Sequence, residues 1–174
     1  MDESAPSHLE AKLGVTPNTY DPHSAAEYRE LAIRMVAQAS RTLSLISPDL
    51  EPSIYDRPPF ISALKQLALK SRIARIRILV QDSSLVRKQG HRLIELAQRL
   101  SSTIEIRKPD REYRDFAESF LLVDDCGYLH RKLADRYRAT ACFNDRLQVS
   151  QLEEIFSDAW ERGEPDMELV RLHL

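Results

Sequence analysis

Hydrophobic residues recur along most of the chain with either helical or strand spacing, and the two kinds of segment alternate. Tyr28, Leu31 and Met35 share one helical face, which predicts a helix after Ser24, where Ser24 and Glu27 have the spacing of a capping box. Further helices are expected from Pro58, from residue 84 to 100, and from Ser150, which opens a second capping box with Glu153. The expected strands are 42–46, 75–80, 103–107, 120–123, 128–132, 138–143 and 167–174.

This order predicts an α/β protein with a single domain, in which a mixed β-sheet is flanked by helices on both faces. Residues 1–23 contain three prolines and no sustained apolar period, so we expect a flexible N-terminal arm before a domain at 24–174. Four prolines in residues 48–59 predict an irregular loop, and loops of that length are often functional.

Composition narrows the class of protein. The 174 residues carry 25 Lys and Arg against 27 Asp and Glu, a balance that argues against binding nucleic acid or membranes through bulk charge. There is no apolar segment long enough to cross a membrane, and the acidic N-terminus lacks the features of a signal peptide. With only Cys126 and Cys142, we expect a reduced, cytoplasmic protein without membrane contact.

Motifs for cofactors and metals are missing from the sequence. Five scattered histidines and two separated cysteines show no metal-ligand spacing, which predicts no metal site. Four isolated glycines exclude the Gly-rich loops that bind nucleotide phosphates, so no cofactor is expected.

Basic residues gather in two segments. One lies in the helix expected after residue 84, and the other includes His130 and the residues up to Arg138, among them Arg136. Such a cluster is either a solvated charged face or an anion-binding patch, and arginine favours phosphate because its guanidinium binds in a bidentate manner. The candidate anion-binding residues are Arg87, Lys88, His91, Arg131 and Lys132.

The segment from Phe116 to Trp160 resembles the second half of a phospholipase D-like domain. That superfamily has His-x-Lys-(x)4-Asp on one strand, then Gly-Ser-x-Asn, then a helix with an apolar-Phe-Trp stripe. Here Phe120-Leu-Leu-Val-Asp124 matches the first strand, Ala141-Cys-Phe-Asn144 the place of Gly-Ser-x-Asn, and the helix through Phe156 and Trp160 the stripe.

Counting back from Asp124 places Ala117 where the family has its nucleophilic histidine and Ser119 where it has its lysine. A methyl group cannot attack phosphorus, and a hydroxyl supplies no positive charge to the transferring phosphoryl group. The resemblance therefore implies a non-catalytic domain of the bacterial style, in which Asp124 only caps its hairpin turn.

The leading interpretation is a pseudoenzyme that acts as a binding or protein-interaction module. The resemblance implies homodimer formation, an as yet unknown protein partner, and a role accessory to an acyltransferase-type enzyme. The first alternative is binding of nucleic acid or another anion, with Asn144 beside the basic residues. The second is a cryptic phosphodiesterase, with His91 or His130 as base and Asp124 or Asp125 as its orienting carboxylate.

Overall fold

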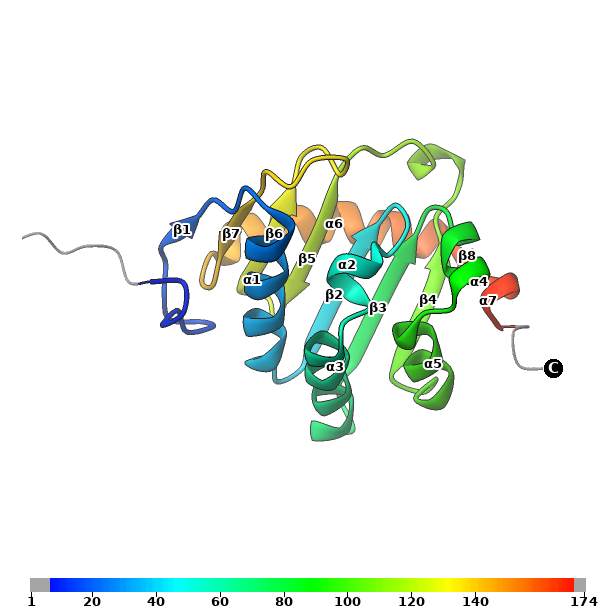
Figure 1. Cartoon of the computed structure of the whole chain (residues 1–174), viewed down its shortest axis with the longest axis horizontal. Helices are drawn as coiled ribbons and strands as arrows, with labels where there is room; N and C mark the ends of the chain where they lie inside the picture. Colours follow the sequence, from blue (N-terminus) through cyan, green and yellow to red (C-terminus); the bar gives the residue numbers. More distant parts are fainter. Residues whose placement is uncertain (1–6, 171–174) are drawn as a thin grey trace, which may run out of the picture.

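The computed structural model describes residues 7–170, which form one mixed sheet between two layers of helices (Figure 1). The strand order is β1-β7-β6-β5-β2-β3-β4-β8, with β2, β3 and β4 parallel and the other neighbours antiparallel. The strands are β1 (Thr19–Tyr20), β2 (Thr42–Ser47), β3 (Arg75–Val80), β4 (Ile104–Lys108), β5 (Ser119–Val123), β6 (Gly127–Arg131), β7 (Thr140–Cys142) and β8 (Glu164–Pro165).

Helices cover both faces of the sheet, as predicted. One face carries α1, α3 and α5, and α6 lies alone across the other (Figure 1). The α-helices are α1 (Ala25–Ala37), α2 (Pro52–Tyr55), α3 (Pro58–Lys70), α4 (Ser84–Gln89), α5 (Arg92–Arg99), α6 (Arg146–Arg162) and α7 (Met167–Val170), and a single 3-10 turn, η1, spans Arg111–Tyr113.

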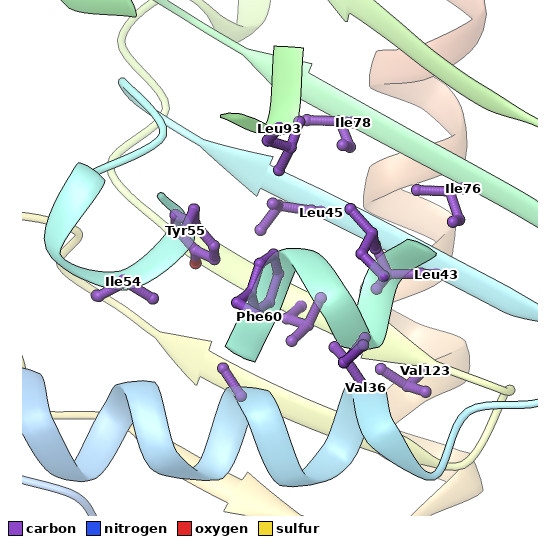
Figure 2. Close-up of a cluster of buried hydrophobic side chains, with 14 of the residues drawn as sticks. Val36, Leu43, Leu45, Ile54, Tyr55, Phe60, Ile76, Ile78, Leu93 and Val123 are labelled. Atoms are coloured by element: carbon purple, nitrogen blue, oxygen red, sulfur yellow. The ribbon is translucent and has the colours of Figure 1, made fainter. Parts of the chain in front are cut away.

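The larger core lies between the sheet and the helices α1, α3 and α5. Leu43 and Leu45 of the central strand β2 point into it, and Phe60 of α3 packs edge-on against Tyr55 at 5.4 Å between ring centroids (Figure 2). The smaller core, under α6, contains Phe156 and Trp160, the residues of the predicted stripe. Because strand side chains alternate between faces, consecutive residues of β2 serve the two cores in turn.

The turn of the β5–β6 hairpin is tied to the start of β2 by Asp124. Its carboxylate accepts hydrogen bonds from the backbone N–H groups of Ser40 (2.6 Å), Arg41 (2.8 Å) and Thr42 (2.9 Å), and from the Ser40 hydroxyl (3.0 Å). The expectation that Asp124 caps its own hairpin is therefore wrong. It caps a segment more than 80 residues away in the sequence, which no local pattern could indicate.

Several boundaries differ from the sequence predictions. The helix expected over 84–100 is two helices, because Gly90 has φ +74° and His91 caps a new helix. The helix α6 begins before Ser150, since Asp145 accepts from the N–H of Gln148 and is the true cap. The loop over 48–59 contains the short α2.

The structure at both ends of the described chain also differs from the sequence predictions. The capping box at Ser24 is confirmed, but residues 7–23 do not form a free arm: β1 pairs with β7, and the N–H of Gly14 donates to the carbonyl of Phe143 at 2.7 Å. The strand expected over 167–174 is wrong for its described part, which is the helix α7; residues 171–174 and 1–6 lie outside the described residues.

Within residues 7–170, none of the helices combines the length and apolar character that a membrane span requires. In the same range, no three His, Cys, Asp or Glu side chains are arranged to hold a metal ion.

We expect Asp124→Asn to lower the free energy of unfolding at neutral pH by about 2–3 kcal/mol. The amide NH2 of the asparagine would face backbone N–H groups from which the carboxylate now accepts hydrogen bonds. Asp125→Asn is the matched control, since Asp125 is exposed and also has a positive φ. Chemical denaturation of both variants measures the difference, and equal losses would contradict the role of Asp124.

The stability that Asp124 provides should depend on pH. Burial of this carboxyl acts to raise its pKa, but the hydrogen bonds from Thr42, Ser40 and Arg41 outweigh burial and hold the pKa below its usual value. Because the pKa of Asp124 is lower in the folded state than in the unfolded state, its contribution to folding stability is complete above the unfolded pKa of about 4. That contribution is lost as pH falls through the folded pKa. Acid titration of stability should therefore be less steep for Asp124→Asn than for the wild type.

Candidate functional site

The end of the sheet where β2 and β3 finish and β5 begins holds Ala117 and Ser119, the positions at which the resemblance places the catalytic His and Lys of its relatives. Ala117 is exposed just before β5, and its carbonyl accepts from the N–H of Ala134 at 2.8 Å. Ser119 is fully buried, and its hydroxyl donates to the carbonyl of Ile46 at 2.9 Å. The Ala117 methyl group cannot attack phosphorus, and the Ser119 hydroxyl is buried, committed to the backbone and without positive charge.

Asn144 does not join this site. Ser119 pairs with Arg131 at one end of the hairpin, whereas Asn144 follows β7 at the other end, where the N–H of Asp145 donates to the carbonyl of Cys126. The hairpin separates Asn144 from Ala117 by a distance on the order of 20 Å. The predicted set of Ala117, Ser119, Asp124 and Asn144 is therefore divided between two ends of the sheet.

Arg131 fills the interior beside the vacant lysine position. Its side chain is 2% exposed; the guanidinium lies 4.6 Å above the Tyr28 ring and contacts Glu51 at 3.4 Å. Tyr137 also donates its hydroxyl to Glu51, and burial raises the pKa of Tyr55 well above the usual value for a phenol. Arg131 is thus enclosed by aromatic rings and a carboxylate, and it is withdrawn from any ligand.

The other predicted anion-binding residues lie apart from this site. Arg87, on α4, forms an ion pair with Glu168 at 2.7 Å, and Lys88 is exposed on the same helix. His91 is buried: it pairs with the carbonyl of Leu50 at 2.9 Å, and burial lowers its pKa. His91 is therefore a cap and a core residue, so the five candidates do not form one patch.

A polar groove of about 640 Å³ lies beside the loop that joins β6 and β7. Lys132, Arg136 and Arg138 line it and are exposed, and within residues 7–170 none of the three forms an ion pair with a carboxylate. Asp21 contributes the one carboxylate among its lining residues. Three unpaired cations against one carboxylate create a positive potential suited to an anion.

His130 lies in the wall of this groove and is 8% exposed. It pairs with Glu118 at 2.6 Å, and its ring packs edge-on against Phe120 at 5.9 Å. Neither Asp124 nor Asp125 can orient it, because both lie in the turn at the opposite end of the β5–β6 hairpin. The expected pairing of His130 with either aspartate is therefore corrected to a pairing with Glu118.

Some residues of the groove were predicted from the sequence, and others were not. The run of basic residues up to Arg138 pointed to Lys132, Arg136 and Arg138. Asp21 and His23 were missed because their segment has no periodicity, although it lies against the loop after β6 and the N–H of Ala139 donates to the carbonyl of Pro22.

Comparison with known sequences identifies one family. A profile of the family described as "Domain of unknown function (DUF7931)" matches residues 24–172, which is nearly the whole chain. No curated protein sequence matches the chain.

Comparison with solved structures identifies the fold. TrmBL2, an archaeal chromatin protein that binds DNA, aligns over 87% of this chain and 54% of its own, with a TM-score of 0.62 and 18% identity. Nuc from Salmonella typhimurium, a phospholipase D family member, aligns over 86% and 97% with a TM-score of 0.60 and 16% identity. NucT from Helicobacter pylori aligns over 85% and 97% with a TM-score of 0.60 and 10% identity. The predicted phospholipase D-like fold is confirmed.

We expect Arg131→Met to destabilise the protein by about 2–4 kcal/mol, because it removes the buried cation between Glu51 and the Tyr28 ring. Arg138→Met is the matched control, since the exposed Arg138 should change stability by less than about 0.5 kcal/mol. Denaturant midpoints measure both. Comparable losses in the two variants would contradict a structural role particular to Arg131.

Proposed function

The chain belongs to the family described as "Domain of unknown function (DUF7931)", and from its phospholipase D-like fold we propose a non-catalytic binding module whose ligand carries phosphate. The observation that carries this proposal is the groove with three unpaired cations, Lys132, Arg136 and Arg138. It adjoins the segment of Ala117 and Glu118, since Glu118 pairs with His130 in the groove wall and the carbonyl of Ala117 accepts from the N–H of Ala134.

The ligand contact we propose is with phosphate oxygens. Guanidinium groups bind such oxygens in pairs, and an exposed lysine adds a mobile point charge. No Tyr, Trp or Phe is among the lining residues of the groove, so stacking on nucleobases does not contribute. We therefore expect recognition of the phosphate itself, without preference for base sequence.

The triple variant Lys132→Ala, Arg136→Ala, Arg138→Ala should weaken binding of a short fluorescein-labelled duplex DNA at least tenfold at low salt. The log–log salt slope should fall by about 0.9 for each phosphate that the variant no longer neutralises. The matched control removes three exposed cations at the opposite end of the sheet and on α3: Lys65→Ala, Arg72→Ala, Arg75→Ala. Fluorescence anisotropy measures both proteins across a salt series.

Two further arms distinguish the sources of phosphate. If inorganic pyrophosphate binds through the same three residues and DNA does not bind, the groove is a site for a small phosphate ligand. If neither probe binds the wild type, or if both triple variants weaken binding equally, the proposal is wrong. A defined protein that co-purifies after nuclease treatment would then favour a protein-interaction module.

A second candidate function is favoured by the pair of His130 and Glu118, which places an imidazole with an orienting carboxylate in the wall of the basic groove. For a non-catalytic module, we expect no turnover of bis(p-nitrophenyl) phosphate by the wild type. If the wild type does turn over this substrate and both His130→Ala and Glu118→Gln abolish the turnover, the protein is a phosphodiesterase with a rebuilt site, and the binding-module proposal is wrong.

A further inference from the structure

The loop that joins β6 and β7 carries the cations of the basic groove on one of its sides. Residues 136, 137 and 138 are exposed, half-buried and exposed in turn, which is the alternation of an extended segment that continues into β7. Arg136 and Arg138 both line the groove, and Tyr137 between them is not among its lining residues. Tyr137 therefore lies on the opposite side of the segment from the two arginines.

On that opposite side, Tyr137 is bound to the interior of the protein. Its hydroxyl donates a hydrogen bond to the carboxylate of Glu51, and this bond raises the pKa of Tyr137. Its ring lies 5.7 Å from the guanidinium of Arg131, which also lies over the ring of Tyr28. Tyr137 thus attaches the middle of the arginine-bearing segment to the protein interior.

Glu51 is held in place by contacts of its own. It follows β2, at the same end of the sheet as the loop after β6 (Figure 1). Its carboxylate accepts from the hydroxyl of Ser53 at 3.1 Å and from the guanidinium of Arg131 at 3.4 Å. Leu50, just before it, has φ +52°, and its carbonyl pairs with the buried ring of His91 at 2.9 Å. A leucine adopts this left-handed conformation only where its surroundings enforce it, so Glu51 is a rigid anchor for Tyr137.

The loop is also tied at two other points, one on each side of Tyr137. The N–H of Ala134 donates to the carbonyl of Ala117 at 2.8 Å, and the N–H of Ala139 donates to the carbonyl of Pro22 at 3.2 Å. The contact between Tyr137 and Glu51 lies between these two bonds in the sequence, at the level of the two arginines.

This anchor adds no net charge to the groove. The carboxylate of Glu51 is balanced by the guanidinium of Arg131, and neither residue lines the groove. Removal of the Tyr137 hydroxyl therefore leaves the cations that face a ligand unchanged in number. The effect of their position can be measured separately from the effect of their charge.

We propose that Glu51 and Tyr137 are positioning residues of the basic groove, whose hydrogen bond holds Arg136 and Arg138 in the arrangement that binds a phosphate ligand. This inference rests on the proposed phosphate-binding function. A ligand held by two guanidinium groups needs both in place at once. Its apparent affinity therefore falls with the fraction of molecules in which the loop is correctly placed.

The variant that tests this role is Tyr137→Phe, which removes the hydroxyl and keeps the ring beside Arg131. It should weaken binding of the fluorescein-labelled duplex DNA, or of inorganic pyrophosphate if that is the ligand the groove binds, about five- to tenfold at low salt. Fluorescence anisotropy measures the DNA, and isothermal titration calorimetry measures the pyrophosphate.

The matched control is Tyr113→Phe, which removes another hydrogen bond from a tyrosine to a carboxylate. Tyr113 donates to Asp158 at 2.6 Å, and neither residue lines the groove. Both variants should lower the melting temperature by about 2–4 °C. The control should leave the affinity unchanged, so a loss of affinity in Tyr137→Phe alone is not explained by stability.

Backbone ¹⁵N relaxation in the absence of ligand tests the position of the loop directly. In Tyr137→Phe, the heteronuclear NOE of the Arg136 and Arg138 amides should fall, which reports greater motion on the picosecond-to-nanosecond timescale. In Tyr113→Phe, the same two amides should keep their wild-type values.

Three results would overturn the positioning role. They are wild-type affinity in Tyr137→Phe, equal losses of affinity in both phenylalanine variants, and tighter binding by Glu51→Gln, since the carboxylate would then act on the ligand by charge. The proposed function fails by other results: the wild type binds neither probe, or the triple variant of the groove weakens binding no more than its control. The two failures are therefore distinguishable.

Discussion

The hydrogen bonds from Ser40, Arg41 and Thr42 to the Asp124 carboxylate fix how the two parts of the sheet join. They hold the β5–β6 hairpin turn against the entry to β2, so that β5 pairs with β2 in one register, Leu43 opposite Val123. A slip of one residue would send the apolar side chains of β5 to the wrong faces. This register also sets the positions of Ser119 and Arg131, which pair at the end of the hairpin away from its turn.

That far end is a packed interior. The Ser119 hydroxyl is bonded to the backbone, and Arg131 lies beneath Tyr28 and beside Glu51. The Arg131 guanidinium is held in the interior by the carboxylate of Glu51 and the rings of Tyr28 and Tyr137. Lys132, Arg136 and Arg138, in contrast, are exposed around the groove beside the loop that joins β6 and β7.

Two of the cavities among the described residues lie at opposite edges of the sheet and differ in character. The groove near β6 and β7 is polar and basic, and no carboxylate of residues 7–170 forms an ion pair with Lys132 or Arg138. The cavity near β4 is lined mostly by apolar side chains. Neither Ala117 nor Ser119 is among the residues that line these two cavities.

The sequence by itself determined the alternation of helices and strands, the cap at Ser24 and the apolar faces of both cores, because each depends on local spacing. Only the tertiary structure decided which charges are free. Arg131 ends β6 and Lys132 follows directly after it, yet the Arg131 side chain lies inside against Glu51 and Lys132 is exposed. Local sequence cannot show such differences, since the partner of a charge comes from segments that are distant in the chain.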